Sequence, residues 1–277
     1  MGSSAQIPTK SVESTLEVRN LSVRYATEEG APVSALEGVD FSISPGEIVG
    51  LLGESGSGKS SLAASILGLL PADAEASGSI VFNGAEMVGR SAPELWSIRG
   101  REVAMVHQDP SLSLNPVLRV GTQVEEVVRA HKKMSRSART RQAKEALAQA
   151  RIEDSDRIYG SYPHQLSGGE RLRVTLAQAI VCGPKLLIAD EPTASVDPTI
   201  QSSILRTFRD LQSEMGTAIL LITHDPAILA GVAQRVLILH CGKLVEEGPI
   251  SQVFAHPSNS YAQQLVSLIP KAFEAQS

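Results

Sequence analysis

Short apolar runs separated by helical stretches set the pattern of this chain. Five runs are almost continuously apolar, which is typical of parallel strands that are buried on both faces of a sheet. The alternation of such runs with helical stretches predicts an α/β fold with a mostly parallel sheet. The apolar runs cover residues 48–52, 102–106, 186–189, 218–222 and 236–239, and the helical stretches cover 60–70, 170–181 and 200–215.

Two other parts of the chain depart from this pattern. In the first 90 residues, segments such as 16–19 and 78–82 alternate between apolar and polar positions, which predicts an antiparallel layer beside the main sheet. From 94 to 166, by contrast, Ala, Arg, Gln and Glu are frequent and strand formers are rare. That composition predicts an inserted helical subdomain.

A run of basic residues lies inside the predicted insertion. Residues 129–151 contain eight Lys or Arg and one acidic residue. One interpretation is a solvated helix face, and the other is a face that lies near acidic lipid headgroups or a partner protein. The solvated face is the simpler interpretation, and the sequence leaves both open.

Size and composition limit the class of protein. The chain has 277 residues, 42% of them hydrophobic, and a net charge of −5, which argues against a nucleic-acid binder. Cys182 and Cys241 lie too far apart in sequence for a disulfide framework or a closely spaced metal pair, so we expect both to be buried and reduced. No signal-like segment or run of ~18–20 apolar residues is present, so we expect a soluble protein that reaches any membrane through partners.

A glycine-rich segment directly follows the first apolar run. Residues 53–60 fit the pattern G-x-x-x-x-G-K-[ST] between a predicted strand and a predicted helix. The glycines let the backbone curl so that successive N–H groups face phosphate oxygens, and the helix adds the positive end of its dipole. Lys59 would then bridge the β- and γ-phosphates, and the Ser60 hydroxyl would bind Mg²⁺. The predicted nucleotide-binding residues here are Gly53, Glu54, Ser55, Gly56, Ser57, Gly58, Lys59, Ser60 and Ser61.

Two acids end another apolar run. Asp190 and Glu191 follow residues 186–189, and ligands of open α/β sheets bind at the carboxyl ends of the strands. Asp190 is therefore expected to hold Mg²⁺, through water, and Glu191 is placed to act as a general base on the attacking water. The glycine-rich loop and the acidic pair together predict a P-loop NTPase (RecA-like) core.

A third motif narrows the class. Residues 166–170 read Leu-Ser-Gly-Gly-Glu, between the phosphate loop and the acidic pair, and they resemble the ABC signature LSGGQ. Four more features match ABC ATPases in the same order, over about residues 16–270. They are Tyr25, Gln108, the D-loop-like segment 194–197 that ends in Asp197, and His224. On these motifs the chain is identified as a member of the ABC ATPases.

The resemblance implies a role for each position. Tyr25 would stack on adenine, although it could also be a core or edge aromatic. Gln108 would be the Q-loop glutamine, which contacts the metal and takes part in catalysis. His224 would be the switch histidine, which acts in catalysis together with Lys59 and Glu191.

The family also implies that nucleotide binds between two ATPase subunits, identical or paralogous, that are arranged head to tail. Ser167 and Gly169 of one chain would contact the γ-phosphate held by the phosphate loop of the other. Gly168, Glu170 and Asp197 complete the implied nucleotide contacts. A helix N-terminus with small residues can approach a phosphate closely and offer it N–H donors. A single chain would then hold half of each active site.

Two stretches resemble the branch that imports oligopeptides and dipeptides, which also includes nickel and glutathione importers. They are 107–116 and the tail that runs from 242–249 through 256–257 and Tyr261 to 268–270. Many members continue into a cysteine-bearing tail, whereas no cysteine follows Cys241, so we predict no iron–sulfur cluster. The signature ends in Glu170 rather than Gln, and segment 194–197 reads Ala-Ser-Val-Asp where Ser-Ala-Leu-Asp is usual.

The implied function is ATP hydrolysis that energises uptake of an oligopeptide, dipeptide or related small solute. The chain would act at the cytoplasmic face of the cell membrane, with a second ATPase, two permeases that contact segment 112–120, and an extracytoplasmic binding protein. The alternative is an ABC ATPase acting on DNA or the ribosome. It is disfavoured because Lys59 and Ser167 are only 108 positions apart (167 minus 59), which leaves no room for a long insertion.

The expected organisation follows from these motifs. Residues 1–14 would be a flexible N-terminus, and 15–93 with 167–247 would form the nucleotide-binding core with its antiparallel layer. Residues 94–166 would be the inserted helical subdomain, and 248–277 a C-terminal extension typical of the branch.

Overall fold

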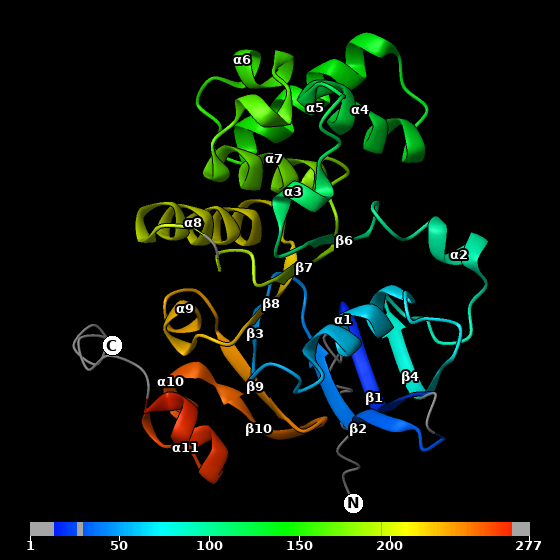
Figure 1. The fold of residues 1–277 in the computed structure, drawn as a ribbon, viewed down its shortest axis with the longest axis vertical. Helices are drawn as coiled ribbons and strands as arrows, with labels where there is room; N and C mark the ends of the chain where they lie inside the picture. Colours follow the sequence, from blue (N-terminus) through cyan, green and yellow to red (C-terminus); the bar gives the residue numbers. More distant parts are fainter. Residues whose placement is uncertain (1–13, 27–29, 195, 268–277) are drawn as a thin grey trace, which may run out of the picture.

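Two sheets organise the computed structural model, which describes residues 14–26, 30–194 and 196–267. Most of the expected flexible N-terminus, Ser195 of the D-loop-like segment and the tail element 268–270 lie outside the described residues. The larger sheet has the strand order β10-β9-β3-β8-β7-β6, and the smaller has the order β2-β1-β4-β5 (Figure 1).

The larger sheet is parallel except at one edge. Strands β9, β3, β8, β7 and β6 run parallel to their neighbours, and only β10 pairs antiparallel, with β9. The predicted mostly parallel sheet is thereby confirmed. Its strands are β3 (Ile48–Leu52), β6 (Val103–Val106), β7 (Leu186–Asp190), β8 (Ala218–Thr223), β9 (Arg235–His240) and β10 (Lys243–Pro249).

The smaller sheet is the predicted antiparallel layer, because every pair within it is antiparallel. Its inward positions alternate with exposed ones, as expected for a sheet with one wet face. Its strands are β1 (Leu16–Tyr25), β2 (Val33–Ile43), β4 (Ala74–Phe82) and β5 (Ala85–Glu86), and the short helix α2 (Ala92–Trp96) follows them.

Both faces of the parallel sheet are apolar, and each belongs to a different core. In β3, Ile48 and Leu52 point into one core, and Val49 and Leu51 into the other, because side chains alternate along a strand. The smaller sheet and α1 (Lys59–Leu67) cover the second face. The first face is covered by α7 (Gly168–Ile180), α8 (Pro198–Met215), α9 (Pro226–Ala230), α10 (Ile250–Ala255) and α11 (Ser260–Val266).

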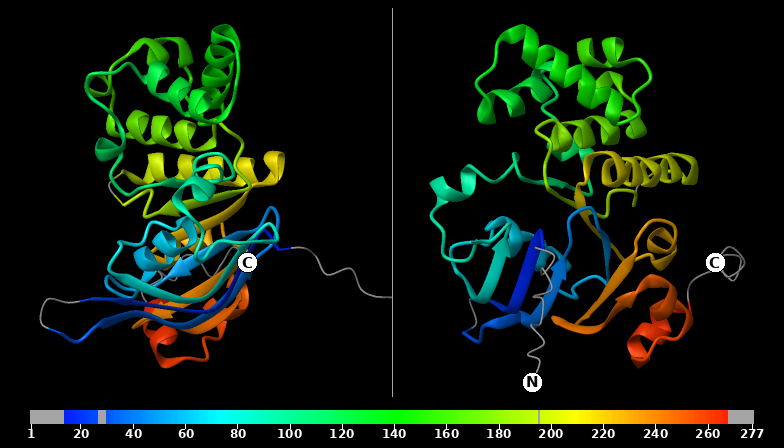
Figure 2. Two further views of the ribbon diagram at one scale, coloured as in Figure 1. Left: turned by 90° about the vertical axis from the view of Figure 1, so that its right-hand side faces the viewer. Right: turned by 180° about the vertical axis from the view of Figure 1, so that it is seen from behind.

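A group of helices stands at one end of the molecule (Figures 1 and 2). We call helices α4 to α6 the helical block, and α7 lies between this block and α8 in both figures. The members are α4 (Val120–His131), α5 (Arg136–Gln149) and α6 (Ser155–Gly160). The short helix α3 (Pro110–Ser113) leads from β6 to this block and lies beside α7, and the 3₁₀ turn Pro163–Gln165 leads from the block to α7.

The structure confirms one expected strand and corrects one other expectation. The apolar run 102–106, which lies inside the range 94–166, forms the predicted strand, because Val103–Val106 is β6 and pairs with β7 in the parallel sheet. Cys241 is exposed rather than buried, because it lies in the turn between β9 and β10, whereas Cys182 is buried as expected.

The basic stretch 129–151 forms the end of α4 and most of α5. Several of its cations pair with acids of the same chain, including Arg129 with Glu126 at 3.1 Å and Lys144 with Asp156 at 2.5 Å. The side chains of these pairs are 41–78% exposed, and such pairs contribute only about 0–1 kcal/mol. This arrangement favours the solvated helix face. Among the described residues, no helix is both long enough and apolar enough to span a membrane.

Candidate nucleotide-binding site

The glycine-rich loop connects β3 to α1, and its glycines are needed where they stand. Gly58 has φ 110° and Gly56 has φ 80°, values that side-chain-bearing residues rarely adopt. A Cβ atom at Gly58 would lie 2.5 Å from the main-chain oxygen of Ala35, and one at Gly53 would lie 2.4 Å from that of Leu239. The loop is thus enclosed by β2 and β9, and only glycine allows this close approach.

We expect Gly58→Ala to destabilise the fold by about 2 kcal/mol or more, since backbone strain and a clash with main-chain oxygen add up. Gly84→Ala is the matched control. Gly84 also has positive φ, 78°, but a Cβ atom there would meet nothing within 4 Å, so only the strain of about 1 kcal/mol remains. Urea unfolding of both variants measures the difference. Equal losses of unfolding free energy would contradict the close approach at Gly58.

Lys59 folds back onto the loop. Its ammonium donates to the main-chain oxygens of Gly53 at 2.7 Å and Glu54 at 2.8 Å. Burial lowers the pKa of Lys59, and the negative charges of Glu191 and Asp190 oppose this effect. The loop therefore presents one largely buried cation close to two carboxylates.

Tyr25 reaches the same region from the end of β1. Its hydroxyl donates to the Ser61 hydroxyl at 3.1 Å, although the two residues are 36 positions apart. The side chain is partly buried. Tyr25, which the family resemblance assigns to adenine, is thereby fixed next to the start of α1.

The acidic pair lies at the carboxyl end of β7. Glu191 has φ 44°, a left-handed conformation that costs a non-glycine residue on the order of 1–3 kcal/mol. Its N–H donates to the main-chain oxygen of Ile222 at 2.9 Å, which ties the turn to the neighbouring strand β8. His224 follows β8, and its Nδ1 lies 2.9 Å from the Glu191 carboxylate. The structure therefore brings the predicted base and the predicted switch histidine into direct contact.

Asp190 is a partly buried carboxylate beside a second one. Burial is the main cause that raises the pKa of Asp190, the Glu191 charge adds to it, and Lys59 opposes both. Asp190 lines an open cavity of about 830 Å³ together with Gln108. Two of the three predicted metal contacts thus line one cavity, and the third, Ser60, is not among its lining residues.

These donors fit Mg²⁺. The predicted set consists of a hydroxyl, an amide and a carboxylate oxygen, and Mg²⁺ prefers oxygen ligands, of which the protein supplies few and the substrate phosphates and water supply the rest. Within the part of the chain that the structure describes, no group of three or more His, Cys, Asp or Glu could hold a metal by itself.

The signature turn begins α7 with a capping box. The Ser167 side chain accepts from the Glu170 N–H at 3.2 Å, and the Glu170 carboxylate accepts from the Ser167 N–H at 2.8 Å and from its hydroxyl at 2.9 Å. The Arg157 guanidinium forms an ion pair with the same carboxylate. Partial burial disfavours the charged form, but the bonds from Ser167 and Arg157 outweigh burial and lower the pKa of Glu170.

Two further residues of the predicted set have structural roles. Gly169 is buried, and a Cβ atom there would lie 2.7 Å from the Ile200 side chain. The carboxylate of Asp197 accepts from the N–H groups of Thr199 and Ile200, so it caps α8. Gly168 is exposed beside them.

The predicted residues fall into two groups. The loop with Lys59 begins α1, on the face of the sheet that carries the smaller sheet, whereas Ser167 begins α7, on the opposite face. Two contacts at this site were not predicted from the sequence. Arg157 contacts the signature turn from the helical block, and Tyr261 accepts from the Glu54 N–H of the loop. No local spacing signals either contact.

Comparisons with known proteins agree with this geometry. Residues 36–194 match the family model described as ABC transporter. The chain is 40% identical over 256 residues to the oligopeptide transport ATP-binding protein OppD of Haemophilus influenzae, covering 92% of this chain and 79% of that protein. It is 42% identical over 257 residues to the oligopeptide transport ATP-binding protein AppD of Bacillus subtilis, covering 92% and 78%.

Solved structures give the same result. The dimeric post-hydrolysis structure of the ATP-binding cassette MJ0796 with ADP and Pi has a TM-score of 0.76 and 28% identity, covering 85% of this chain and 98% of that one. CbiO1 from Clostridium perfringens, part of the transporter complex CbiONQ, also has a TM-score of 0.76 and 28% identity, covering 95% and 98%. This chain belongs to the ABC transporter family of P-loop ATPases, which bind and hydrolyse ATP with Mg²⁺.

Proposed function

We propose that this chain is the peripheral ATPase subunit of a peptide importer, bound at the cytoplasmic face of the membrane. It works with a second ATPase subunit and two permease subunits, and an extracytoplasmic binding protein delivers the peptide. The names of the relatives support the peptide, since OppD and AppD are oligopeptide transport ATP-binding proteins. The observation that carries the proposal is the division of the phosphate loop and the signature turn between opposite faces of one sheet.

Opposite faces favour a head-to-tail pair. When two copies pair in opposite orientations, the phosphate loop of each can face the signature turn of the other. Ser167 and Gly169 then complete the site around the terminal phosphate, with the positive end of the α7 dipole directed at it. Asp197 lies at the start of α8, beside the same turn, and contributes to this contact. Dimeric structures among the relatives support such pairing.

Within each half-site, different residues bind different parts of the nucleotide. The curled loop and Lys59 bind the phosphates, and Tyr25 stacks on adenine. Ser60, Asp190 and Gln108 would hold Mg²⁺, which would neutralise charge on the phosphates. Glu191 accepts the proton of the attacking water, and His224 holds its carboxylate in place.

The permease contact lies after Gln108. Leu112 is 86% exposed and Val117 is 76% exposed, although both are large apolar side chains in the segment predicted to meet a partner. Leu112 lines the same cavity as Gln108 and Asp190. A permease element that docks there would therefore touch the wall of the metal site. In this proposal residues 15–93 and 167–247 bind nucleotide, 94–166 carry the permease contact, and 248–277 are the extension of the branch.

Affinity purification of the tagged chain from detergent-solubilised membranes tests the assembly. We expect two polytopic membrane proteins to co-purify, together with a second ATPase subunit. Replacing Val117, which does not line that cavity, by Ser should weaken the recovery of the membrane proteins while leaving ATP binding unchanged. Recovery of nucleic acid or ribosomes in place of membrane proteins would overturn the proposal.

Glu170 places a negative charge beside a phosphate-binding turn, and Arg157 offsets it. We expect Arg157→Gln to lower ATP turnover of the dimer about fivefold, which corresponds to about 1 kcal/mol for an exposed charge pair. Adding Glu170→Gln to Arg157→Gln should restore turnover, because the signature turn then carries no carboxylate charge for Arg157 to neutralise. Steady-state hydrolysis of the two single variants and the double variant measures this coupling. Additive losses would contradict it.

A further inference from the structure

A tyrosine from the C-terminal part of the chain contacts the phosphate loop. The N–H of Glu54 donates to the hydroxyl of Tyr261 at 3.0 Å, although 207 positions separate the two residues. Tyr261 lies in α11 and is only 8% exposed. We propose that Tyr261 is a positioning residue that keeps the phosphate loop in its nucleotide-binding shape. This inference rests on the proposed binding of ATP phosphates by that loop.

The ring of Tyr261 is itself held in place. It packs against the ring of His240, with the ring centroids 3.8 Å apart and the planes tilted by 31°. His240 ends β9, and in the turn that follows the N–H of Gly242 donates to the main-chain oxygen of Ser57 at 2.9 Å. The β9–β10 turn and α11 therefore hold the loop at two points, Ser57 and Glu54.

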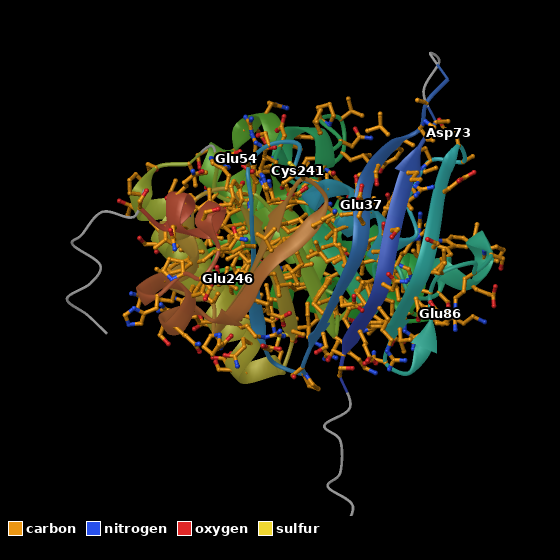
Figure 3. All side chains as sticks on the ribbon, turned by 90° about the horizontal axis from the view of Figure 1, so that it is seen from below. Glu37, Glu54, Asp73, Glu86, Cys241 and Glu246 are labelled. Atoms are coloured by element: carbon orange, nitrogen blue, oxygen red, sulfur yellow. The ribbon has the colours of Figure 1, made fainter. Side chains whose placement is uncertain are left out.

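The start of α11 is fixed to the edge of the parallel sheet. The Glu246 carboxylate on β10 accepts from the N–H groups of Ser258 at 2.8 Å and Asn259 at 2.9 Å. The Asn259 side chain in turn accepts from the N–H of Tyr261 at 2.8 Å. Figure 3 labels Glu246 on β10 and Glu54 on the loop. A hydrogen-bonded chain thus runs from β10 through the start of α11 to the phosphate loop.

The bond to Tyr261 matters most when Lys59 leaves the loop. In this structure the main-chain oxygen of Glu54 accepts from the Lys59 ammonium at 2.8 Å, so both sides of this residue are held. When Lys59 turns to the phosphates it releases that oxygen, and the bond that the Glu54 N–H donates to the Tyr261 hydroxyl persists. Without the hydroxyl, the loop would spend more time in other conformations. The apparent affinity for nucleotide would then fall in proportion to the fraction of molecules whose loop keeps the binding conformation.

Tyr261→Phe tests the proposal, because it keeps the ring against His240 and removes only the acceptor. Tyr159→Phe is the matched control, since its hydroxyl donates to Glu125 inside the helical block, at the other end of the molecule from α11 (Figure 1). We expect Tyr261→Phe to raise the dissociation constant for MgATP about 3- to 10-fold, the range that corresponds to one lost hydrogen bond. KM should rise by a similar factor while kcat at saturation stays unchanged.

Amide hydrogen exchange gives a second readout that overall stability would not mimic. Exchange at Glu54 should accelerate in Tyr261→Phe and stay at the wild-type rate in Tyr159→Phe. Glu246→Ala, which loosens the start of α11 without touching the tyrosine, should shift ATP affinity in the same direction.

The outcomes are distinct. Wild-type affinity and wild-type Glu54 exchange in Tyr261→Phe would overturn the positioning role and leave the proposed function intact. An equal loss of affinity in Tyr159→Phe would also overturn it, because the effect would then reflect general destabilisation. If the wild-type chain bound no MgATP, the proposed function would fail, and the inference with it.

Discussion

Glu191→Gln is expected to reduce ATP hydrolysis by roughly 10²-fold or more while nucleotide binding persists, in line with typical contributions of a general base. The amide keeps the shape of the side chain and an oxygen that can accept from His224, so the contact at 2.9 Å need not be lost. What the variant loses is the group that takes the proton from water. Because hydrolysis then no longer separates the subunits, an ATP-bound dimer should accumulate. Turnover assays and size-exclusion chromatography with MgATP measure both effects.

Glu145→Gln is the matched control for this prediction. Glu145 lies on α5, its side chain is 63% exposed, and it forms only a long ion pair with Arg141 at 3.8 Å. Its replacement should leave hydrolysis and dimer lifetime unchanged. Normal hydrolysis by Glu191→Gln would refute the assignment of Glu191 as the base.

Lys59→Ala is expected to abolish tight nucleotide binding, which is a different defect. The variant removes the one cation that the loop itself supplies, and charge-assisted hydrogen bonds to a phosphate are worth about 1.5–3 kcal/mol. The dissociation constant for MgATP should therefore rise at least about tenfold, as titration calorimetry can measure. Hydrolysis at low ATP concentration should fall in parallel.

Lys185→Ala separates the loss of this ammonium group from a general effect of removing a lysine. Lys185 is 61% exposed and pairs with Glu102 at 3.7 Å, away from the phosphate loop. It should bind MgATP like the wild type. The thermal stability of both variants should also be measured, because Lys59 donates to two main-chain oxygens of the loop and its loss can destabilise the fold. Wild-type affinity in Lys59→Ala would contradict the assigned role.

Much of the site follows from the sequence because its chemistry is local. The loop with Lys59, the pair Asp190 and Glu191 and the signature turn at Ser167 are each contiguous, and each lies at the end of a strand or the start of a helix. A short segment with a fixed backbone conformation restricts the residue types at its own positions, so it can be recognised in the sequence. The same holds for the buried parallel strands, whose near-continuous apolar runs have no exposed face to keep polar.

The parts that escaped prediction depend on contacts between distant segments. Apolar runs indicate strands but not their order, so nothing local indicates that β6 forms the edge of the sheet within a stretch whose composition favours helix. The same limit applies to Tyr261, whose partner is 207 positions away, and to Arg157, which reaches Glu170 from the helical block. Cys241 was expected to be buried because it follows an apolar run. It lies instead in the turn after that run, where it is exposed.

The strand order has a consequence for folding of the chain during its synthesis on the ribosome. Strand β3, which carries the phosphate loop, lies between β8 and β9, and both of these neighbours come from the last quarter of the chain. While the first 217 residues are being made, β3 has neither of these sheet partners, and its loop has no fixed frame. Contacts of such long sequence separation form late in folding. A nascent chain should therefore acquire the capacity to hold nucleotide only after β8 and β9 have been made.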